Sequence, residues 1–447
     1  MRKNTLMNIC LAVALLFVST QSFAFDRAKM DSLFDALSAN NKMMGTATLS
    51  KDGKVIYQRA IGFVGPDGKK AATPDTKYRI GSISKMFTAV MIFQLVEEKK
   101  LSLTTPLSVF FPKIPNADKI TIEDMLHHSS GIRSFTDDIA YRGYMEKPKT
   151  EEEMLAIMYA LPAAFEPGTK NEYSNSNFVL LGYIIEKLTG NTYAEALKAR
   201  ITNKIGLKNT YYGGKIRNDK NEASSFAWNS ETNKWEVQPE TDMSIPHGAG
   251  AIVSTSGDLA KFLEALFAGK LIAKESLEQM RTLKNGFGAG MFPIPFNDKT
   301  GYGHNGGIDG FASMASYFPG DSLAFAYVTN GMDYSLNDVG IGALSIYYGA
   351  PYEIPSFKVV SVPKEILDSY VGVYTSEELP MEITIKRDGG KLTAQATGQR
   401  ELTLDASSET AFTFRPAGLE ITFSRDGASP KFTLKQGGMS FNYKKKQ

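Results

Sequence analysis

The stretch Ser82–Leu95 restricts the fold of this chain more than any other feature. Its residues are apolar on nearly every side of a helix, and Lys85 is its only charged member. A helix without a polar face is stable only where other elements surround it. The chain has 447 residues, of which 43% are hydrophobic and 11% aromatic, so it can bury such a helix in a large core. We therefore expect a large domain around this helix.

The flanking sequence predicts strands on both sides of a helical region. Runs typical of strands occur at Thr46–Ser50 and Val55–Ala60, and the Asp-Gly pair between them favours a hairpin. Strand-like runs return at Gly310–Phe318 and Ala324–Thr329. Helices are expected at the start of the domain, where Leu33, Phe34 and Leu37 share a face, and near 121–127, 150–160, 175–189, 192–204 and 255–268. This order predicts an α+β fold with a split antiparallel sheet and an inserted helical region.

The pattern changes near residue 351. Pro351, Pro355 and Pro363 interrupt the sequence, and beyond them apolar residues alternate in short runs separated by turns such as Gly437-Gly438. Several short strands at regular spacing predict a small antiparallel β-barrel. The expected organisation is therefore a first domain at 25–350, a linker at 351–364 and a barrel domain at 365–447.

Residues 1–24 have the pattern of a secretory signal peptide. Arg2 and Lys3 precede an apolar run, Met7–Val18, that is too short to span a bilayer, and small residues come before Phe25. Cleavage after Ala24 predicts an exported protein, periplasmic or secreted, with no membrane span. The only cysteine, Cys10, is lost with this segment, which excludes disulfides and thiolate metal sites from the mature chain.

Charge and histidine content argue against several classes of partner. The chain has 50 Lys and Arg against 48 Asp and Glu, and loss of Arg2 and Lys3 leaves 48 of each. This balance offers no electrostatic basis for binding nucleic acid or an anionic membrane. Four histidines without an HExxH pattern do not indicate a metal site, so no cofactor is expected. The sequence leaves the oligomeric state open.

The first of three chemical motifs opens the buried helix. Ser82 and Lys85 are three residues apart, which places both on one helical face. A serine hydroxyl becomes a nucleophile when a neighbouring base takes its proton, and a lysine can be that base if burial lowers its pKa. Free N–H groups at the helix start favour a developing oxyanion. Taken alone, this spacing also suits a capped helix with a surface lysine, and Ser84 faces elsewhere.

Two further motifs follow in order along the chain. Tyr173 can shuttle protons, and Asn175 can bind both Lys85 and a substrate amide, although Ser and Asn are also common helix caps. Gly303–Gly307 borders a predicted strand, where glycines let a substrate backbone approach, although the segment also suits a plain turn. The three motifs together favour an active site over these structural alternatives.

The sequence resembles the serine β-lactamase and penicillin-binding protein superfamily, in particular its class C-like branch. That branch includes DD-carboxypeptidases, D-aminopeptidases and esterases, and its motifs S-x-x-K, Y-[SA]-N and [KH]-x-G match Ser82/Lys85, Tyr173/Asn175 and His304/Gly306. The resemblance implies a β-lactamase-like fold over about residues 26–350. It also implies an oxyanion hole formed by the N–H groups of Ser82 and Gly307. The segment after 365 resembles the lipocalin-like domain of some relatives.

One motif departs from the β-lactamase pattern. Where those enzymes carry Lys-Thr-Gly, this chain has His304-Asn305-Gly306. Histidine is largely neutral at pH 7, and asparagine lacks the hydroxyl that helps to hold a substrate carboxylate. We therefore expect poor binding of penicillin-type carboxylates, partly restored near pH 6 if His304 gains a proton. Glu166 lies in a turn common to the class C-like branch and is interpreted as structural.

The sequence thus predicts an exported serine hydrolase that forms an acyl-enzyme on Ser82. Lys85 and Tyr173 handle the protons, and the sequence does not decide which is the base. Asn175, His304, Asn305 and Gly306 are the predicted substrate-binding residues. Small esters, or amides and peptides with D-residues, are the expected substrates. The alternatives are a β-lactamase or DD-carboxypeptidase, and a non-catalytic sensor that binds acyl groups or peptides.

Overall fold

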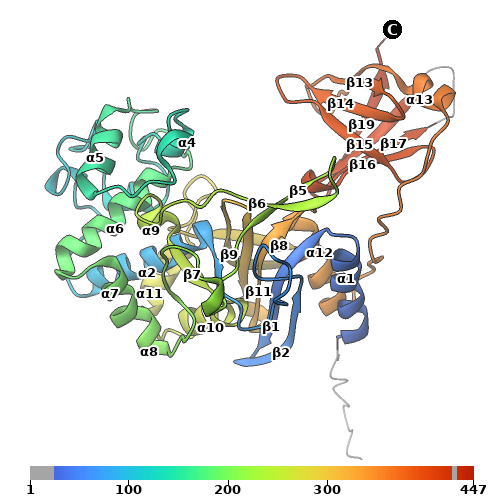
Figure 1. Ribbon diagram of the computed structural model, residues 1–447. Helices are drawn as coiled ribbons and strands as arrows, with labels where there is room; N and C mark the ends of the chain where they lie inside the picture. Colours follow the sequence, from blue (N-terminus) through green and yellow to red (C-terminus); the bar gives the residue numbers. More distant parts are fainter. Residues whose placement is uncertain (1–24, 425–429, 447) are drawn as a thin grey trace, which may run out of the picture.

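The computed structural model describes residues 25–424 and 430–446. The predicted signal peptide at 1–24, with Cys10, lies outside the described residues. Figure 1 shows a large body of helices and strands, joined by an extended segment to a smaller body of strands at the C-terminal end. In the described ranges, no helix is both long enough and apolar enough to cross a bilayer.

The main sheet of the large body joins the two ends of this region. Its strands are β1 (Met43–Lys51), β2 (Lys54–Ile61), β8 (Phe292–Phe296), β9 (Lys299–Ile308), β10 (Phe311–Phe318) and β11 (Leu323–Met332), in the order β2-β1-β11-β10-β9-β8. Antiparallel pairing of β1 with β11 adds the N-terminal hairpin to the C-terminal strands. The predicted α+β fold with a split sheet is confirmed.

Helices cover both faces of this sheet. On one face, α1 (Arg27–Ala39) packs with α12 (Leu336–Tyr348), and Leu33, Phe34 and Leu37 share a core cluster with residues of β1 and β11. On the other face lies α10 (Ser256–Phe267), whose Ser256 hydroxyl lies 2.8 Å from that of Thr48 on β1. The sheet is therefore enclosed between two apolar cores.

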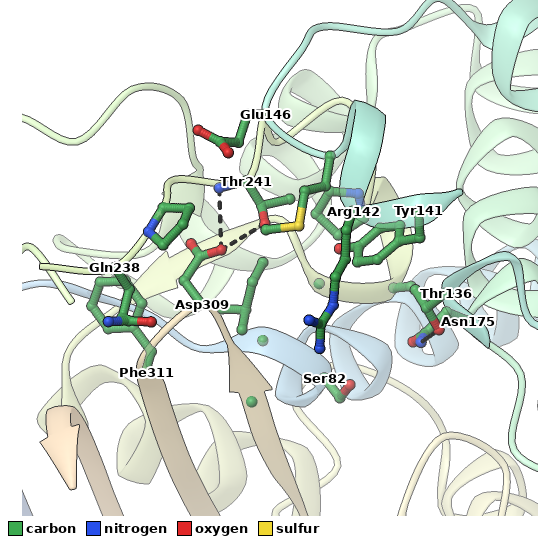
Figure 2. A pocket seen from close by; sticks show the side chains of 18 of the residues that line it. Ser82, Thr136, Tyr141, Arg142, Glu146, Asn175, Gln238, Thr241, Asp309 and Phe311 are labelled. Carbon is green, nitrogen blue, oxygen red and sulfur yellow. Dashed lines mark hydrogen bonds between the residues drawn. The ribbon is translucent and has the colours of Figure 1, made fainter. Parts of the chain in front are cut away.

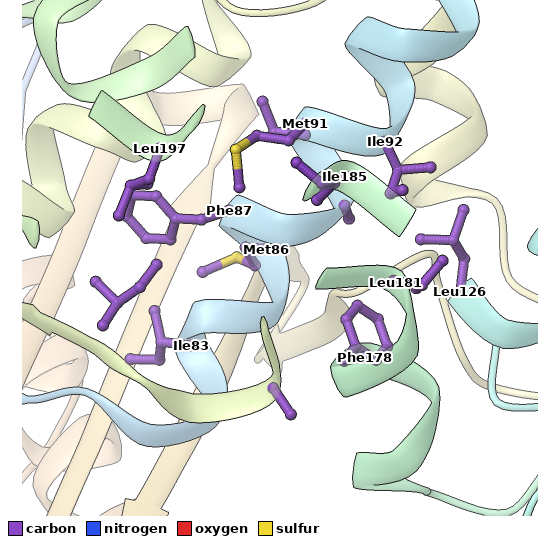
Figure 3. Close-up of a cluster of buried hydrophobic side chains, with 14 of the residues drawn as sticks. Ile83, Met86, Phe87, Met91, Ile92, Leu126, Phe178, Leu181, Ile185 and Leu197 are labelled. Carbon is purple, nitrogen blue, oxygen red and sulfur yellow. The ribbon is translucent and has the colours of Figure 1, made fainter. Parts of the chain in front are cut away.

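The predicted buried helix is α2 (Ser84–Glu97), preceded by a 3₁₀ turn at Gly81–Ile83. All of its residues from Ser84 to Leu95 are buried. Figure 3 shows its Met86 and Met91 between α6 (Asn175–Thr189), which contributes Phe178, and the segment that carries Leu197. Neighbours on every side explain why this sequence has no polar face.

The remaining helices of the large body lie mostly in the inserted region. They are α3 (Ile122–Leu126), α4 (Tyr141–Tyr144), α5 (Glu151–Ala160), α7 (Tyr193–Leu197), α8 (Asn203–Ile205), α9 (His247–Gly250) and α11 (Lys274–Arg281). The large body also contains strands that the sequence did not predict. A small sheet consists of β3 (Tyr78–Arg79), β4 (Tyr211–Tyr212) and β7 (Ile252–Ser254), and a hairpin that pairs with β11 consists of β5 (Phe226–Asn229) and β6 (Lys234–Val237). These strands are too short to show a clear alternation in the sequence.

The C-terminal body is a closed eight-stranded barrel, β12-β13-β14-β15-β16-β17-β18-β19, preceded by α13 (Lys364–Tyr370). Its strands are β12 (Gly372–Thr375), β13 (Ile383–Asp388), β14 (Lys391–Ala396), β15 (Leu402–Ala406), β16 (Ala411–Phe414), β17 (Leu419–Ser424), β18 (Lys431–Gln436) and β19 (Met439–Lys445). Aromatic rings fill the interior, with Tyr370 stacked on Phe423 at 3.9 Å and Phe432 on Tyr443 at 4.9 Å. The predicted barrel is confirmed, whereas its lipocalin-like character stays a prediction.

The expected linker, 351–364, contacts both bodies. Tyr352, Ile354 and Phe357 pack against the core of the large body, and Val362 lies in the core of the barrel. The domain boundaries at 350 and 365 stay a prediction, and the structure adds that this segment has apolar contacts along its length.

Candidate active site

The turn that carries Ser82 lies directly against the edge of the main sheet. Gly81, just before it, has a φ of +51°, and a Cβ there would lie 2.8 Å from the backbone nitrogen of Gly307 on β9. Only glycine fits such a conformation and such a close approach without strain. This glycine therefore brings the N–H of Gly307 next to the Ser82 residue.

Two side chains from different elements meet at the Ser82 hydroxyl. The Lys85 amine, from the first turn of α2, lies 3.0 Å from Ser82 Oγ. The Tyr173 hydroxyl, from the loop before α6, lies 2.7 Å from the same oxygen. Both distances are those of hydrogen bonds, so either group can exchange a proton with the serine.

Lys85 is completely buried, and its ammonium group has only neutral partners. Besides Ser82, it donates to Asn175 Oδ1 and to the carbonyl oxygen of Ala249, each at 2.8 Å. Burial lowers the pKa of the Lys85 amine well below its usual value, because a charged amine loses its hydration there. The environment thus favours the unprotonated amine, which can accept a proton.

Tyr173 is held in the opposite state. Burial raises the pKa of the Tyr173 phenol, and the hydrogen bond with Ser82 lowers it by a smaller amount. The phenol therefore keeps its proton over the neutral range and donates a hydrogen bond to Ser82 Oγ. Its ring stacks on His128 at 4.5 Å, and burial together with nearby Lys85 lowers the pKa of that histidine well below its usual value.

Asn175 is oriented by hydroxyl groups from a loop that the sequence did not indicate. Its backbone N–H donates to Ser134 Oγ at 3.1 Å, and its side-chain Nδ2 donates to Thr136 Oγ1 at 3.0 Å. These bonds fix the amide so that Oδ1 points to Lys85. The alternative role as a cap belongs to Ser174, which is the N-cap of α6 but makes no side-chain capping bond.

His304, on β9, is more deeply buried than the sequence indicated. His304 is 1% exposed, and its ring packs on Phe292 at 4.8 Å. Burial and the nearby Lys85 lower the pKa of His304 to about 3. The condition for restored carboxylate binding near pH 6, a proton on His304, is therefore disfavoured, because a sequence does not reveal how completely a strand residue is desolvated.

Gly306 and Gly307 of β9 accommodate different neighbours, the protein's own backbone and open space. A Cβ at Gly306 would lie 2.0 Å from the carbonyl oxygen of Ile80, so this glycine accommodates the protein's own backbone. A Cβ at Gly307 would have its nearest neighbour, an oxygen of Phe311, at 4.0 Å, so this position is open to a ligand. Asn305 is exposed on the same strand.

A cleft of about 690 Å³ opens beside Ser82. Ser82, Asn175 and Gly307 line it, together with Thr136, Tyr141, Arg142, Glu146, Gln238, Thr241, Asp309 and Phe311, among others. Lys85 and Tyr173 contact Ser82 but are not part of this lining, and neither are His304, Asn305 and Gly306. Figure 2 shows Ser82, Asn175 and Thr136 on one side of the cleft and Gln238 and Phe311 on the other.

A buried ion pair fixes the far wall of this cleft. Arg79, which is 2% exposed, contacts Asp309 at 2.9 Å and Glu240 at 2.6 Å. Asp309 also accepts hydrogen bonds from the backbone and the hydroxyl of Thr241 (Figure 2). These bonds join the turn between β9 and β10 to the loop after β6.

Some residues of the site were missed by reasoning from the sequence. His128 stacks on Tyr173, a contact that the sequence did not indicate. Ala249 contributes a backbone carbonyl oxygen, which no side-chain motif encodes. Ser134 and Thr136 carry no sequence signal that separates them from ordinary loop residues.

Other candidate groups lie away from the cleft. Glu166 is on the surface, where it contacts Lys119 at 3.3 Å, which fits its interpretation as a structural residue. Over the described residues, no group of three or more His, Cys, Asp or Glu side chains is arranged to hold a metal ion.

The fold and the chemistry of the cleft are those of an acyl-transferring serine hydrolase. The model of the Beta-lactamase family matches residues 30–341, and the chain belongs to this family. Residues 357–447 match a domain of unknown function. The predicted superfamily and the predicted enzyme class, a serine hydrolase, are thereby confirmed.

Known relatives support the same classification. Penicillin-binding protein 4* of Bacillus subtilis is 25% identical over 441 residues, which cover 92% of this chain and 97% of the relative. An octameric penicillin-binding protein homologue from Pyrococcus abyssi is 25% identical with a TM-score of 0.66, covering 94% of this chain and 100% of that one. A D-amino acid amidase from Ochrobactrum anthropi is 25% identical with a TM-score of 0.63, covering 72% and 98%.

Proposed function

We propose that this protein is an exported serine hydrolase that forms an acyl-enzyme on Ser82 with small esters, or with amides and peptides that contain D-residues. The observation that carries the proposal is the pair of hydrogen bonds at Ser82 Oγ, from a buried Lys85 at 3.0 Å and from Tyr173 at 2.7 Å. A hydroxyl with two proton-exchanging neighbours at the wall of an open cleft is equipped for nucleophilic attack.

The proposed reaction has two halves. Ser82 Oγ attacks the substrate carbonyl carbon while its proton passes to Lys85 or Tyr173, and the N–H groups of Ser82 and Gly307 hold the oxyanion. The bond to the leaving group then breaks, and the leaving group takes up the proton. Water attacks the resulting ester, returns a proton to Ser82 and releases the acid. The low pKa of Lys85 favours it as acceptor and the protonated phenol favours Tyr173 as donor, while the identity of the first base stays open.

The choice of substrates follows from the strand edge beside the site. At the position of the β-lactamase Lys-Thr-Gly motif, His304 is buried with a pKa of about 3, so it offers no positive charge to the carboxylate of a β-lactam. Loss of one charge-assisted hydrogen bond weakens transition-state binding by roughly 1.5–3 kcal/mol. Small esters do not need that contact. The likeness to a D-amino acid amidase supports D-residue amides as a second class.

The alternative proposal is a DD-carboxypeptidase or a β-lactamase. It is favoured by the alignment with penicillin-binding protein 4*, which extends over 97% of that relative. The two proposals differ in whether a carboxylate next to the scissile bond improves the substrate.

Export is part of the proposal and rests on the basic start and apolar run of residues 1–24. The proposed location is the periplasm or the medium. Expression of the full chain in a bacterium, followed by mass spectrometry of the exported product, tests this. A mature protein that begins at Phe25 is expected, and one that keeps residues 1–24 would contradict export by cleavage.

The activity is tested by comparing kcat/KM for a chromogenic cephalosporin and a short p-nitrophenyl ester at neutral pH. We expect the ester to be hydrolysed and the cephalosporin to be a poor substrate. A wide margin in favour of the cephalosporin would instead identify a β-lactamase.

A further inference from the structure

Arg142 is a positively charged side chain in the cleft to which the proposed reaction assigns no part. It lies on α4 and lines the cleft together with Ser82 and Asn175. Figure 2 shows its guanidinium directed into the cleft, toward the side where Ser82 lies. Within residues 25–424 and 430–446, this guanidinium makes no hydrogen bond or ion pair, so its donors are available to a ligand.

The backbone that carries Arg142 is fixed by its neighbours. The Tyr141 ring packs edge-on against Phe135 at 5.9 Å and against Tyr144 at 5.7 Å. One residue beyond the helix, the carbonyl of Met145 accepts a hydrogen bond from the backbone of Asp242 at 2.9 Å. Because α4 is held on both sides, only the Arg142 side chain has to be ordered when a ligand binds.

The negative charges of the cleft lie on its other side. Glu146 also lines the cleft, but Figure 2 shows its carboxylate beyond Thr241, away from the Arg142 guanidinium. Asp309 is paired with Arg79 at 2.9 Å. The space between Ser82 and α4 is therefore positive, and a guanidinium there matches the planar geometry of a carboxylate.

We infer that Arg142 binds a carboxylate on the acyl part of the substrate, and that it disfavours acyl parts with a free ammonium group. The acyl part is the one concerned because it stays attached to Ser82 after the leaving group departs, so the cleft has to accommodate it. This inference rests on the proposed function. It narrows the substrates to N-acylated or dicarboxylic acyl donors, in preference to esters and amides of free amino acids.

The test uses three methyl esters that differ in charge on the acyl part. They are N-succinyl-D-alanine (anionic), N-butanoyl-D-alanine (neutral) and D-alanine with its free ammonium group (cationic), and the released acid is titrated. A fourth ester, N-butanoyl-D-alanine esterified with glycolate, carries the carboxylate on the leaving group. The readout is the ratio of kcat/KM between each charged ester and the neutral one, at low ionic strength.

The variants are Arg142→Gln, Arg142→Lys and, as a control, Lys147→Gln. Lys147 is exposed in the same segment and does not line the cleft, so its substitution removes one positive charge elsewhere. We expect Arg142→Gln to lower the anionic-to-neutral ratio about tenfold and to raise the cationic-to-neutral ratio, an effect reduced by solvent because Arg142 is exposed. Arg142→Lys keeps the charge and retains part of the preference. Lys147→Gln leaves both ratios as they are.

The possible results separate this inference from the proposed function. Hydrolysis of the neutral ester with unchanged ratios in Arg142→Gln would overturn the role of Arg142 alone. A wild-type preference for the ammonium ester, or an Arg142 effect confined to the glycolate ester, would also overturn it. If no ester is hydrolysed and no acyl-enzyme forms on Ser82, the proposed function fails and the inference fails with it. A thermal unfolding scan of each variant shows that the ratios belong to folded protein.

Discussion

The large body and the barrel bury very different side chains. The large body encloses charged and polar groups, among them Lys85, Arg79 and all four histidines. Apart from tyrosine hydroxyls, Thr393 is the only polar side chain buried among the described residues of the barrel. Burial of a polar group is costly unless it is paired, so it is expected where chemistry requires it. The large body therefore buries polar groups around its cleft and ion pairs, whereas the described interior of the barrel is almost entirely apolar.

The contacts between the two bodies are aromatic and local. Phe357 packs edge-on against Tyr334 of the large body at 5.6 Å, and Arg415 of the barrel lies 5.1 Å from the centre of the Phe357 ring. A Cβ at Gly418 of the barrel would lie 3.0 Å from Asp338 of α12. The segment around Phe357 therefore connects the two bodies, and changes to it test whether they fold independently.

The largest expected effect is on turnover in the large body. Ser82→Ala removes the proposed nucleophile and should lower kcat by about a thousandfold or more, and it should abolish labelling by an acylating probe in mass spectrometry. The matched control is Ser84→Ala. The Ser84 hydroxyl accepts a hydrogen bond from the backbone of Ile252 at 3.1 Å, so its loss should affect stability and leave labelling intact. Labelling that survives Ser82→Ala, or maps to Ser84, would contradict the assignment.

The second prediction concerns the pH dependence that a buried lysine produces. The amine accepts a proton only in its neutral form, so activity is lost as the pH falls through the lowered pKa of Lys85. We therefore expect log kcat/KM to level off well before the pH of about 10.4 at which a free lysine titrates. His304, with a pKa of about 3, should add no step near pH 6. The measurement is a profile from pH 5 to 10 with the neutral ester.

A profile that keeps rising about tenfold per pH unit up to pH 10 would show that Lys85 titrates like a free lysine, or that it is not the base. A step near pH 6 that disappears in His304→Gln would show that His304 is less desolvated than its burial indicates.

The third prediction compares equivalent core substitutions in the two bodies. Ile92 on α2 and Ile421 on β17 are both completely buried. Replacing either by valine should cost about 0.5–1.5 kcal/mol in the free energy of unfolding. We expect Ile92→Val to lower the unfolding midpoint of the large body and Ile421→Val that of the barrel, with kcat unchanged in the second variant. Calorimetry in which both variants shift one common transition would show that the bodies unfold as a single unit.

The smallest effect is expected from removing the barrel. A chain that ends at Lys358 keeps the apolar contacts of Tyr352, Ile354 and Phe357. It should fold and retain kcat within about threefold, because none of the described residues of the barrel lines the cleft. A chain that ends at Ala350 loses those contacts and should unfold at a lower temperature while its catalytic residues stay in place. A protein that is soluble only as unfolded chain in both cases would show that the two bodies share one core.

Much of the fold was predictable because local pattern encodes it. The alternation of apolar residues indicated the barrel, and the Asp52-Gly53 pair indicated the first hairpin, in which both residues have positive φ. The hairpin of β5 and β6 was not predicted, because its strands pair with the main sheet through a single bridge between Phe226 and Gly331. Such pairing depends on contacts between residues that are far apart in the sequence.

By itself, the sequence determined which residues can react and which helix must be buried. The spacing of Ser82 and Lys85 is local, and their hydrogen bond at 3.0 Å follows from it. The tertiary structure alone decided the state of these groups. The partners of Lys85 come from 90 and 164 residues further along the chain, and the burial of His304 and the direction of Arg142 depend on equally distant elements. Protonation depends on how completely neighbouring elements exclude water, and only the assembled fold sets that exclusion.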